Sequence, residues 1–129
     1  MSIVFAIATN DKESIVRKHF GDSNYFLIYE FDGENLKKID EMENIYKDID
    51  ETTTHGSKEK RQKIVGTLTE KYKVNYLIAG SNSPNFLKIK QTTNIIPLIA
   101  KPETKIDELL DCIKNYRSLD IENSPCFKK

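Results

Sequence analysis

Two histidines are the residues best suited to metal chemistry in this sequence. His19 opens a His-Phe-Gly segment, and His55 opens a His-Gly-Ser segment. Both segments are polar and contain glycine, and neutral imidazole is the commonest metal ligand in proteins. The spacing of the two residues matches no zinc pattern, and the chain has neither C-x-x-C nor H-x-x-x-H. The two imidazoles are therefore candidate ligands, with exposed polar loop residues as the alternative interpretation.

Backbone amides in three glycine-containing loops form a second group of candidate binding groups. Gly21, Gly56 with Ser57, and Gly80 shape these loops. Gly80 follows a predicted strand, and ligands of open α/β sheets bind outside the carboxyl ends of parallel strands. Ser57 is expected to cap a helix, whose free N–H groups attract anions. We expect this helix to start at the opposite edge of the sheet from Gly80, so the sequence does not predict one site from all three loops.

The two cysteines are too few for a disulfide framework or for a permanent iron-sulfur protein, which needs about four thiolates. Cys112 flanks the apolar face of a predicted helix, which favours a packing role. Cys126 lies in the segment 118–129, which we expect to be a flexible tail. An exposed thiol without a role is favoured there over a thiolate ligand. We expect both thiols to be reduced in a cytoplasmic protein.

The elements that position these residues follow from apolar periodicity and turn signals. Strands are predicted at 3–8, 25–31, 35–39, 74–79 and 95–100, and helices after Ser57, from Pro84 to about Lys90 and after Thr104. A loop is expected at 40–57. The order β-ββ-αβαβα predicts one α/β domain over residues 1–117, with a mixed five-stranded sheet and helices on its faces.

Composition and patterning exclude several classes of function. The chain has 129 residues with 20 basic and 20 acidic side chains, and this balance argues against a dedicated nucleic-acid-binding protein. No apolar run approaches the ~20 residues of a membrane span, and no signal peptide is visible. The strands 3–8 and 74–79 carry no carboxylates for two-metal nuclease chemistry, and no P-loop pattern occurs.

Five segments together resemble the dinitrogenase iron-molybdenum cofactor biosynthesis family, the nitrogenase accessory factor group. They are residues 3–9, His19-Phe20-Gly21, residues 25–29, His55-Gly56-Ser57 and residues 77–80 ahead of Pro84. The likeness runs from about residue 2 to residue 115. The chain departs from the family pattern at Ser81 and Lys58, where members commonly have further glycines. The His-Phe-Gly step just before a Phe-Leu-Ile-Tyr strand is the most specific part of the resemblance.

The resemblance implies an α/β fold with a ribonuclease H-like motif and a binding role without catalysis. The implied cargo is an iron-sulfur, iron-molybdenum or related mixed-metal cluster, held transiently between cluster donor and acceptor proteins. His19 matches the family's His-Phe-Gly position, and His55 matches its His-Gly segment. A preformed cluster brings its own sulfide, so one or two protein ligands and backbone donors suffice for a carrier that must release it.

Two alternatives stay open. The domain could be a small regulatory or interaction module that binds an anionic ligand or a protein partner without metal. It could also serve mainly in docking or as a homodimer, through the strand edge near Pro97 or through the aromatic hairpin.

Overall fold

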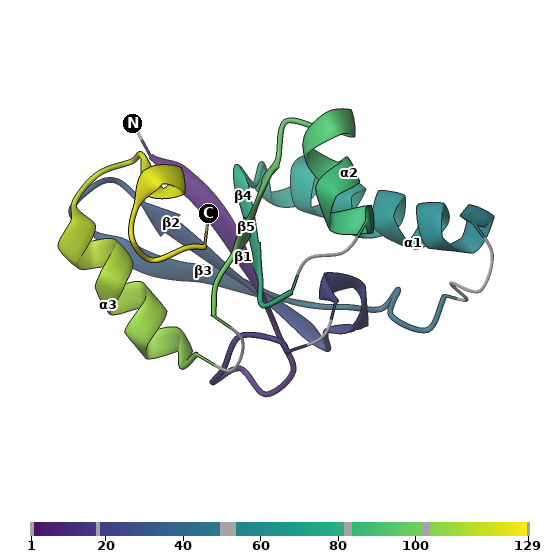
Figure 1. Cartoon of the computed structure of the whole chain (residues 1–129), viewed down its shortest axis with the longest axis horizontal. Coiled ribbons are helices and arrows are strands. Elements are labelled where there is room, and N and C mark those ends of the chain that lie inside the picture. Colours follow the sequence, from purple (N-terminus) through teal and green to yellow (C-terminus); the bar gives the residue numbers. More distant parts are fainter. Residues whose placement is uncertain (1, 18, 50–53, 82–83, 102–103, 129) are drawn as a thin grey trace.

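A five-stranded mixed sheet runs through the protein in the order β3-β2-β1-β4-β5 (Figure 1). The computed structural model describes residues 2–17, 19–49, 54–81, 84–101 and 104–128. The strands are β1 (Ile3–Thr9), β2 (Tyr25–Phe31), β3 (Leu36–Glu43), β4 (Tyr76–Ala79) and β5 (Ile96–Ile99). The pairs β1–β2 and β2–β3 are antiparallel, and the pairs β1–β4 and β4–β5 are parallel. The predicted α/β domain with its mixed sheet is confirmed, while the likeness to ribonuclease H stays a prediction.

The central strand β1 is buried on both faces. Phe5 and Ile7 belong to the core on one side of the sheet, and Ala6 and Ala8 belong to the core on the other side. Alternate side chains of a strand point to opposite faces, so a central strand covered by helices on both sides needs apolar residues throughout. This explains the unbroken apolar run of residues 3–8 in the sequence.

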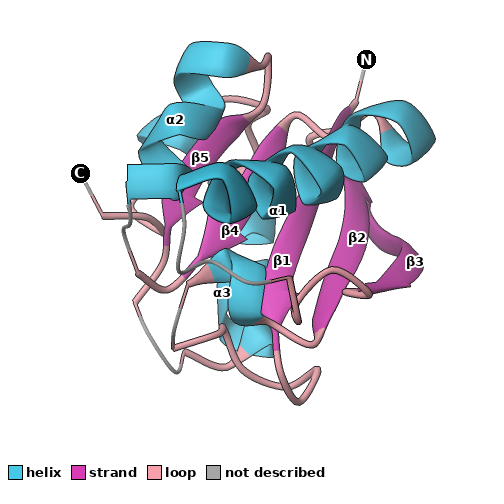
Figure 2. Cartoon of the chain, turned by 90° about the vertical axis from the view of Figure 1, so that its right-hand side faces the viewer, coloured by secondary structure: helices cyan, strands magenta, loops and turns pink. Residues whose placement is uncertain are grey.

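Three helices cover the two faces of the sheet (Figure 2). α1 (Thr54–Thr67), which continues in a π-helical turn (Leu68–Tyr72), packs with α2 (Pro84–Thr92) on one face, and α3 (Ile106–Tyr116) packs on the other. The predicted apolar faces of the first and last helices are confirmed: their buried apolar residues are Ile64, Val65 and Leu68 in the first, and Ile106, Leu109 and Ile113 in the last. Among the described residues, none of the helices combines the length and the apolar character needed to span a bilayer.

Two predicted helix starts were wrong by a few residues. α1 begins at Thr54, so Ser57 lies in its first turn and is not the N-cap. α3 begins at Ile106, with Lys105 as its N-cap residue. The hydroxyl of Thr104, which was expected to cap this helix, instead donates a hydrogen bond of 2.6 Å to the carbonyl of Lys101.

The hairpin strand β3 is longer than the sequence predicts. It extends over Leu36–Glu43, and only its last four residues fall in the segment expected to be a loop. A β-bulge interrupts its pairing opposite Ile28 and Tyr29. β3 lies at the edge of the sheet, where charged side chains reach solvent and are common in natural proteins. The acidic composition that suggested a loop is therefore compatible with an edge strand.

The C-terminal segment packs on the sheet, in contrast to the expected flexible tail. Ile121 is fully buried and Phe127 is 7% exposed, and both join the core on the α3 side. The backbone N–H of Lys128 donates a hydrogen bond of 2.8 Å to the carbonyl of Ile99 in β5. Two apolar side chains and a hydrogen bond to the edge strand fix this segment. Its polar composition gives no indication of these contacts in the sequence.

A disulfide joins Cys112 of α3 to Cys126 of the C-terminal segment. The expectation of two reduced thiols, with Cys112 as a packing residue and Cys126 as a free thiol or ligand, was therefore wrong. The sequence gives no sign of this pairing because a separation of 14 residues and two cysteines is compatible with many folds. Packing of the C-terminal segment beside α3 brings the two residues together.

The hydroxyl of Tyr72 donates a hydrogen bond of 2.5 Å to the carboxylate of Asp40, which joins the end of the π-helical turn to β3. Burial and this hydrogen bond raise the pKa of Tyr72 to about 12, and the same bond is the main cause that lowers the pKa of Asp40. The stabilising contribution of Tyr72 is complete below about pH 10 and is lost as pH rises through about 12. The contribution of Asp40 is complete above about pH 4 and is lost as pH falls further.

The variant Asp40→Asn is expected to lower the pKa of Tyr72 while leaving it above about 10, because the effect of burial remains. An ultraviolet titration, with Tyr72→Phe to identify the signal, measures this change. An alkaline titration curve identical to that of the wild type would contradict the assignment.

Candidate functional site

The carboxyl ends of β1, β3 and β4, like that of β5, lie along one edge of the sheet, which we call the carboxyl edge. Thr9 ends β1 and Ala79 ends β4, and these strands are parallel. Glu43 ends β3 and pairs with Tyr25, which in turn pairs with Thr9. Ligands of open α/β sheets bind at such an edge. The segments that follow these three strands are therefore the first place to look for a site.

α1 begins on the carboxyl side of the sheet and runs toward the amino end of β4, so the expected placement of its start at the opposite edge was wrong. In the middle of α1, the Lys60 ammonium is 2.9 Å from a carboxylate oxygen of Asp22, which lies in the loop between β1 and β2. β3 ends at the carboxyl edge and β4 begins at the other, so the connecting helix must run back across the sheet. Gly80 follows β4 at the carboxyl edge. The segments that hold His19 and Gly80 thus follow strands that end at one edge, and α1 contacts the first of these segments through Lys60.

His19 lies immediately before a short 3-10 turn (Phe20–Asp22) that follows β1, and its side chain is exposed to solvent. Its backbone is extended, with φ −67° and ψ 150°, and its side chain makes no capping hydrogen bond to the turn. Its carbonyl accepts a hydrogen bond of 3.1 Å from the N–H of Asp22. The imidazole is thus at the surface on a backbone that the turn holds in place.

The residue after His19 anchors the turn in the core. Phe20 is 3% exposed, and its ring centroid lies 5.7 Å from that of Phe86 in α2. Such a tilted aromatic pair stabilises packing beyond the area that it buries. The imidazole of His19 faces solvent while the ring of Phe20 packs in the core, which explains why a polar and an apolar ring occur at these adjacent positions.

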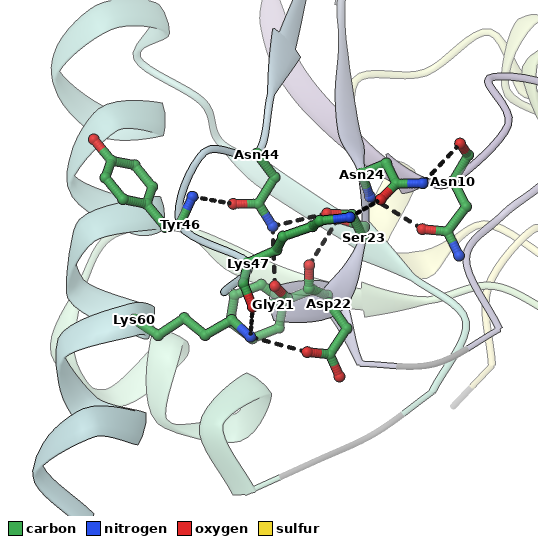
Figure 3. Close-up of polar contacts among 10 residues, drawn as sticks. Asn10, Gly21, Asp22, Ser23, Asn24, Asn44, Tyr46, Lys47 and Lys60 are labelled. Atoms are coloured by element: carbon green, nitrogen blue, oxygen red, sulfur yellow. Dashed lines mark hydrogen bonds and ion pairs between the residues drawn. The ribbon is translucent and has the colours of Figure 1, made fainter. Parts of the chain in front are cut away.

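A buried asparagine holds the same turn from the side of the hairpin (Figure 3). Asn44 follows β3 and is 3% exposed. Its side-chain amide donates hydrogen bonds of 2.9 Å to the carbonyl of Gly21 and 2.8 Å to that of Ser23. Buried carbonyls need such partners because leaving them without one costs free energy. The predicted loop-shaping role of Gly21 thus includes a backbone contact with Asn44.

The variant Asn44→Ala is expected to lower the free energy of unfolding by about 1–3 kcal/mol, because it leaves two carbonyls in the turn without their donor. Chemical denaturation measures this loss. Asn94→Ala, at an exposed position, is the matched control and should change stability by less than about 0.5 kcal/mol. Equal stabilities of the two variants would show that the Asn44 amide does not hold the turn.

Lys60 joins the turn to α1 (Figure 3). Its side chain is 2% exposed, and besides Asp22 its ammonium contacts the carbonyl of Lys47 at 2.7 Å. A lysine within a charged stretch of a helix is usually expected on a solvated face, but Lys60 is buried. A signal was present, because Lys60 precedes buried Ile64 by four residues and buried Leu68 by eight and so shares their helix face.

The other predicted site residues are placed less completely. His55, Gly56 and Ser57 form part of the first turn of α1, and their side chains lie outside the described residues. Gly80 is buried directly after β4. The next residue, Ser81, has a buried hydroxyl oxygen that finds no hydrogen-bond partner among the described residues. Buried polar atoms of this kind are uncommon in native proteins and suit a site that receives a polar ligand.

The donor set does not fit a resident metal ion. Within the described ranges, no three side chains of histidine, cysteine, aspartate or glutamate are grouped as ligands would be. Cys112 and Cys126 are joined to each other, so the disulfide form offers no thiolate. What the carboxyl edge offers is one exposed imidazole and the Ser81 hydroxyl, which has no partner among the described residues, with the backbone amides of the α1 start on the same side of the sheet.

Comparison with protein-family models matches residues 1–116 to the family described as dinitrogenase iron-molybdenum cofactor. A search of curated proteins finds no match. The matched region extends from β1 to the end of α3 and includes every residue of the carboxyl edge described above. Cys126 and the packed C-terminal segment lie outside it.

Proposed function

Since the chain belongs to the dinitrogenase iron-molybdenum cofactor family, we propose that it binds and carries a preformed metal–sulfur cluster. The cargo is an iron-sulfur, iron-molybdenum or related mixed-metal cluster in transit between donor and acceptor proteins, and the chain catalyses no reaction. The observation that carries the proposal is the position of His19. Its exposed imidazole stands at the carboxyl edge on a turn with a buried anchor.

A transient cargo explains the sparse ligands better than a resident cluster would. A permanent iron-sulfur site uses about four thiolates, whereas both cysteines of this chain are in a disulfide. A preformed cluster already contains its sulfide, so a carrier supplies only enough bonds to hold it until transfer. One imidazole from His19, with His55 as the second candidate, meets this requirement.

Neighbouring groups of the carboxyl edge suit an anionic cargo. The first turn of α1 has backbone N–H groups without partners inside the helix, and the helix dipole favours negative charge there. The buried hydroxyl of Ser81, to which no other described residue is hydrogen-bonded, is a donor for a sulfide or oxygen atom. We infer that His19 supplies the metal–ligand bond, while Gly56, Ser57 and Gly80 belong to the segments that surround the cluster.

Anaerobic reconstitution tests this function. The purified protein is mixed with iron and sulfide, with or without molybdate, and then desalted. Retained colour with metal in stoichiometric amount supports the carrier function. A colourless protein without bound metal in both mixtures would contradict it.

The buried hydroxyl of Ser81, which has no partner in the described part of the chain, also favours a second candidate, a module that binds a phosphate-bearing ligand without metal. Such a ligand would raise the melting temperature by several degrees at saturating concentration. A thermal shift with inorganic phosphate in a protein that retains no metal would favour this second function over the carrier.

A further inference from the structure

The burial of Lys60 is not explained by stability alone. An ammonium ion loses several kcal/mol of hydration when buried, and an apolar side chain in its place is often as stable or more so. Lys60 nevertheless lies on the buried face of α1, with its ammonium 2.9 Å from Asp22 and 2.7 Å from the carbonyl of Lys47. What the ion pair provides is a fixed geometry between segments that are 38 residues apart in the sequence.

The residue that Lys60 holds controls the backbone of His19. Asp22 ends the 3-10 turn, and its N–H donates to the carbonyl of His19 at 3.1 Å. On the other side of the turn, the ring of Phe20 packs against Phe86 of α2. The turn is therefore fastened to α1 through a charge pair and to α2 through an aromatic pair.

We propose that the Lys60–Asp22 ion pair is a positioning device for His19, which holds the imidazole at a set place on the carboxyl edge. This inference rests on the proposed cluster-carrying function. Asp22 offsets the charge of Lys60, so the pair acts through geometry more than through attraction of an anionic cluster. Lys60 and Asp22 are thus positioning residues, and His19 is the ligand.

Three variants and a control separate positioning from stability. Lys60→Met replaces the lysine with an unbranched apolar side chain and so removes the charge. Asp22→Asn removes the charge of the partly exposed partner with little change in size. The double variant tests whether the two residues act as one unit. Lys63→Met is the matched control, because Lys63 is exposed on the same helix.

Each single variant is expected to weaken retention of the iron–sulfide or iron–molybdate–sulfide cluster about tenfold, as is typical when a residue that orients a ligand is removed. The double variant should retain at least as much cluster as the single variant that retains less, because the effects of coupled residues are not additive. The hyperfine coupling of an isotope-labelled His19 nitrogen to the cluster should change, and Lys63→Met should leave both measurements unaltered. A loss of stability alone would not alter this coupling in the folded, loaded protein.

Hydrogen exchange of the protein without cargo gives an independent measurement. Exchange of the Asp22 and Ser23 amides should accelerate about tenfold in Lys60→Met and Asp22→Asn, and not in Lys63→Met. If the wild type retains a cluster and both variants retain it equally with the same coupling, the positioning role is wrong and the carrier function stands. If the wild type retains no cluster, the carrier function is wrong, and unaltered exchange would then also overturn the positioning role.

Discussion

Reduction of the disulfide between Cys112 and Cys126 is expected to lower the free energy of unfolding by about 3 kcal/mol. The bond closes a loop with a sequence separation of 14 residues, and closing such a loop restricts the unfolded chain. The bond also fastens the segment that brings Ile121 and Phe127 onto the core. For a chain of this length, we expect the melting temperature to fall by about 10 °C.

Denaturant unfolding with and without a thiol reductant measures this effect. The double variant Cys112→Ser with Cys126→Ser should show the reduced stability under both conditions, because it has no bond to break. Thiol titration of the unfolded, unreduced protein should find no free thiol. Two free thiols, or equal stability with and without reductant, would contradict the disulfide.

Replacement of His19 by alanine is expected to abolish retention of the reconstituted cluster. Removing a residue that merely orients a metal ligand costs roughly 10–100-fold in affinity, so loss of the ligand itself should cost at least about a hundredfold. The fold should be unaffected, because His19 is exposed and its side chain makes no capping hydrogen bond. Metal analysis after desalting gives the retained fraction, and circular dichroism confirms folding.

Two further variants are compared with His19→Ala. Glu34→Ala changes an exposed residue at the opposite edge of the sheet, in the turn after β2, and should retain the cluster fully. His55→Ala tests the second candidate ligand at the start of α1. Retention by His19→Ala equal to that of Glu34→Ala would remove His19 from the site.

Much of the architecture follows from apolar patterning. The run of β1 and the alternation of strand and helix in the second half are strong signals, because two-sided burial and crossovers demand them. The end of β3 was missed, since an edge strand tolerates the charges that also mark loops. The packed C-terminal segment was missed because its buried apolar residues Ile121 and Phe127 stand among polar neighbours.

The sequence predicted individual residues of the site but not how they are arranged in space. His19 and Gly80 stand out by residue type, yet their placement on one edge with the start of α1 depends on the direction of a helix. Asn44 and Lys60 were missed because polar residues are usually exposed, and their burial depends on partners far away in the sequence. Only the tertiary fold shows that they hold the turn after His19.

The place of β1 in the sheet has a consequence for biosynthesis. This strand is made well before its parallel partner β4, as the pairing of Phe5 with Tyr76 shows. Until β4 emerges, the nascent hairpin leaves one side of its most apolar strand open to other chains. We therefore expect aggregation during expression to increase when translation pauses before β4, and chaperones that shield strand edges to suppress it.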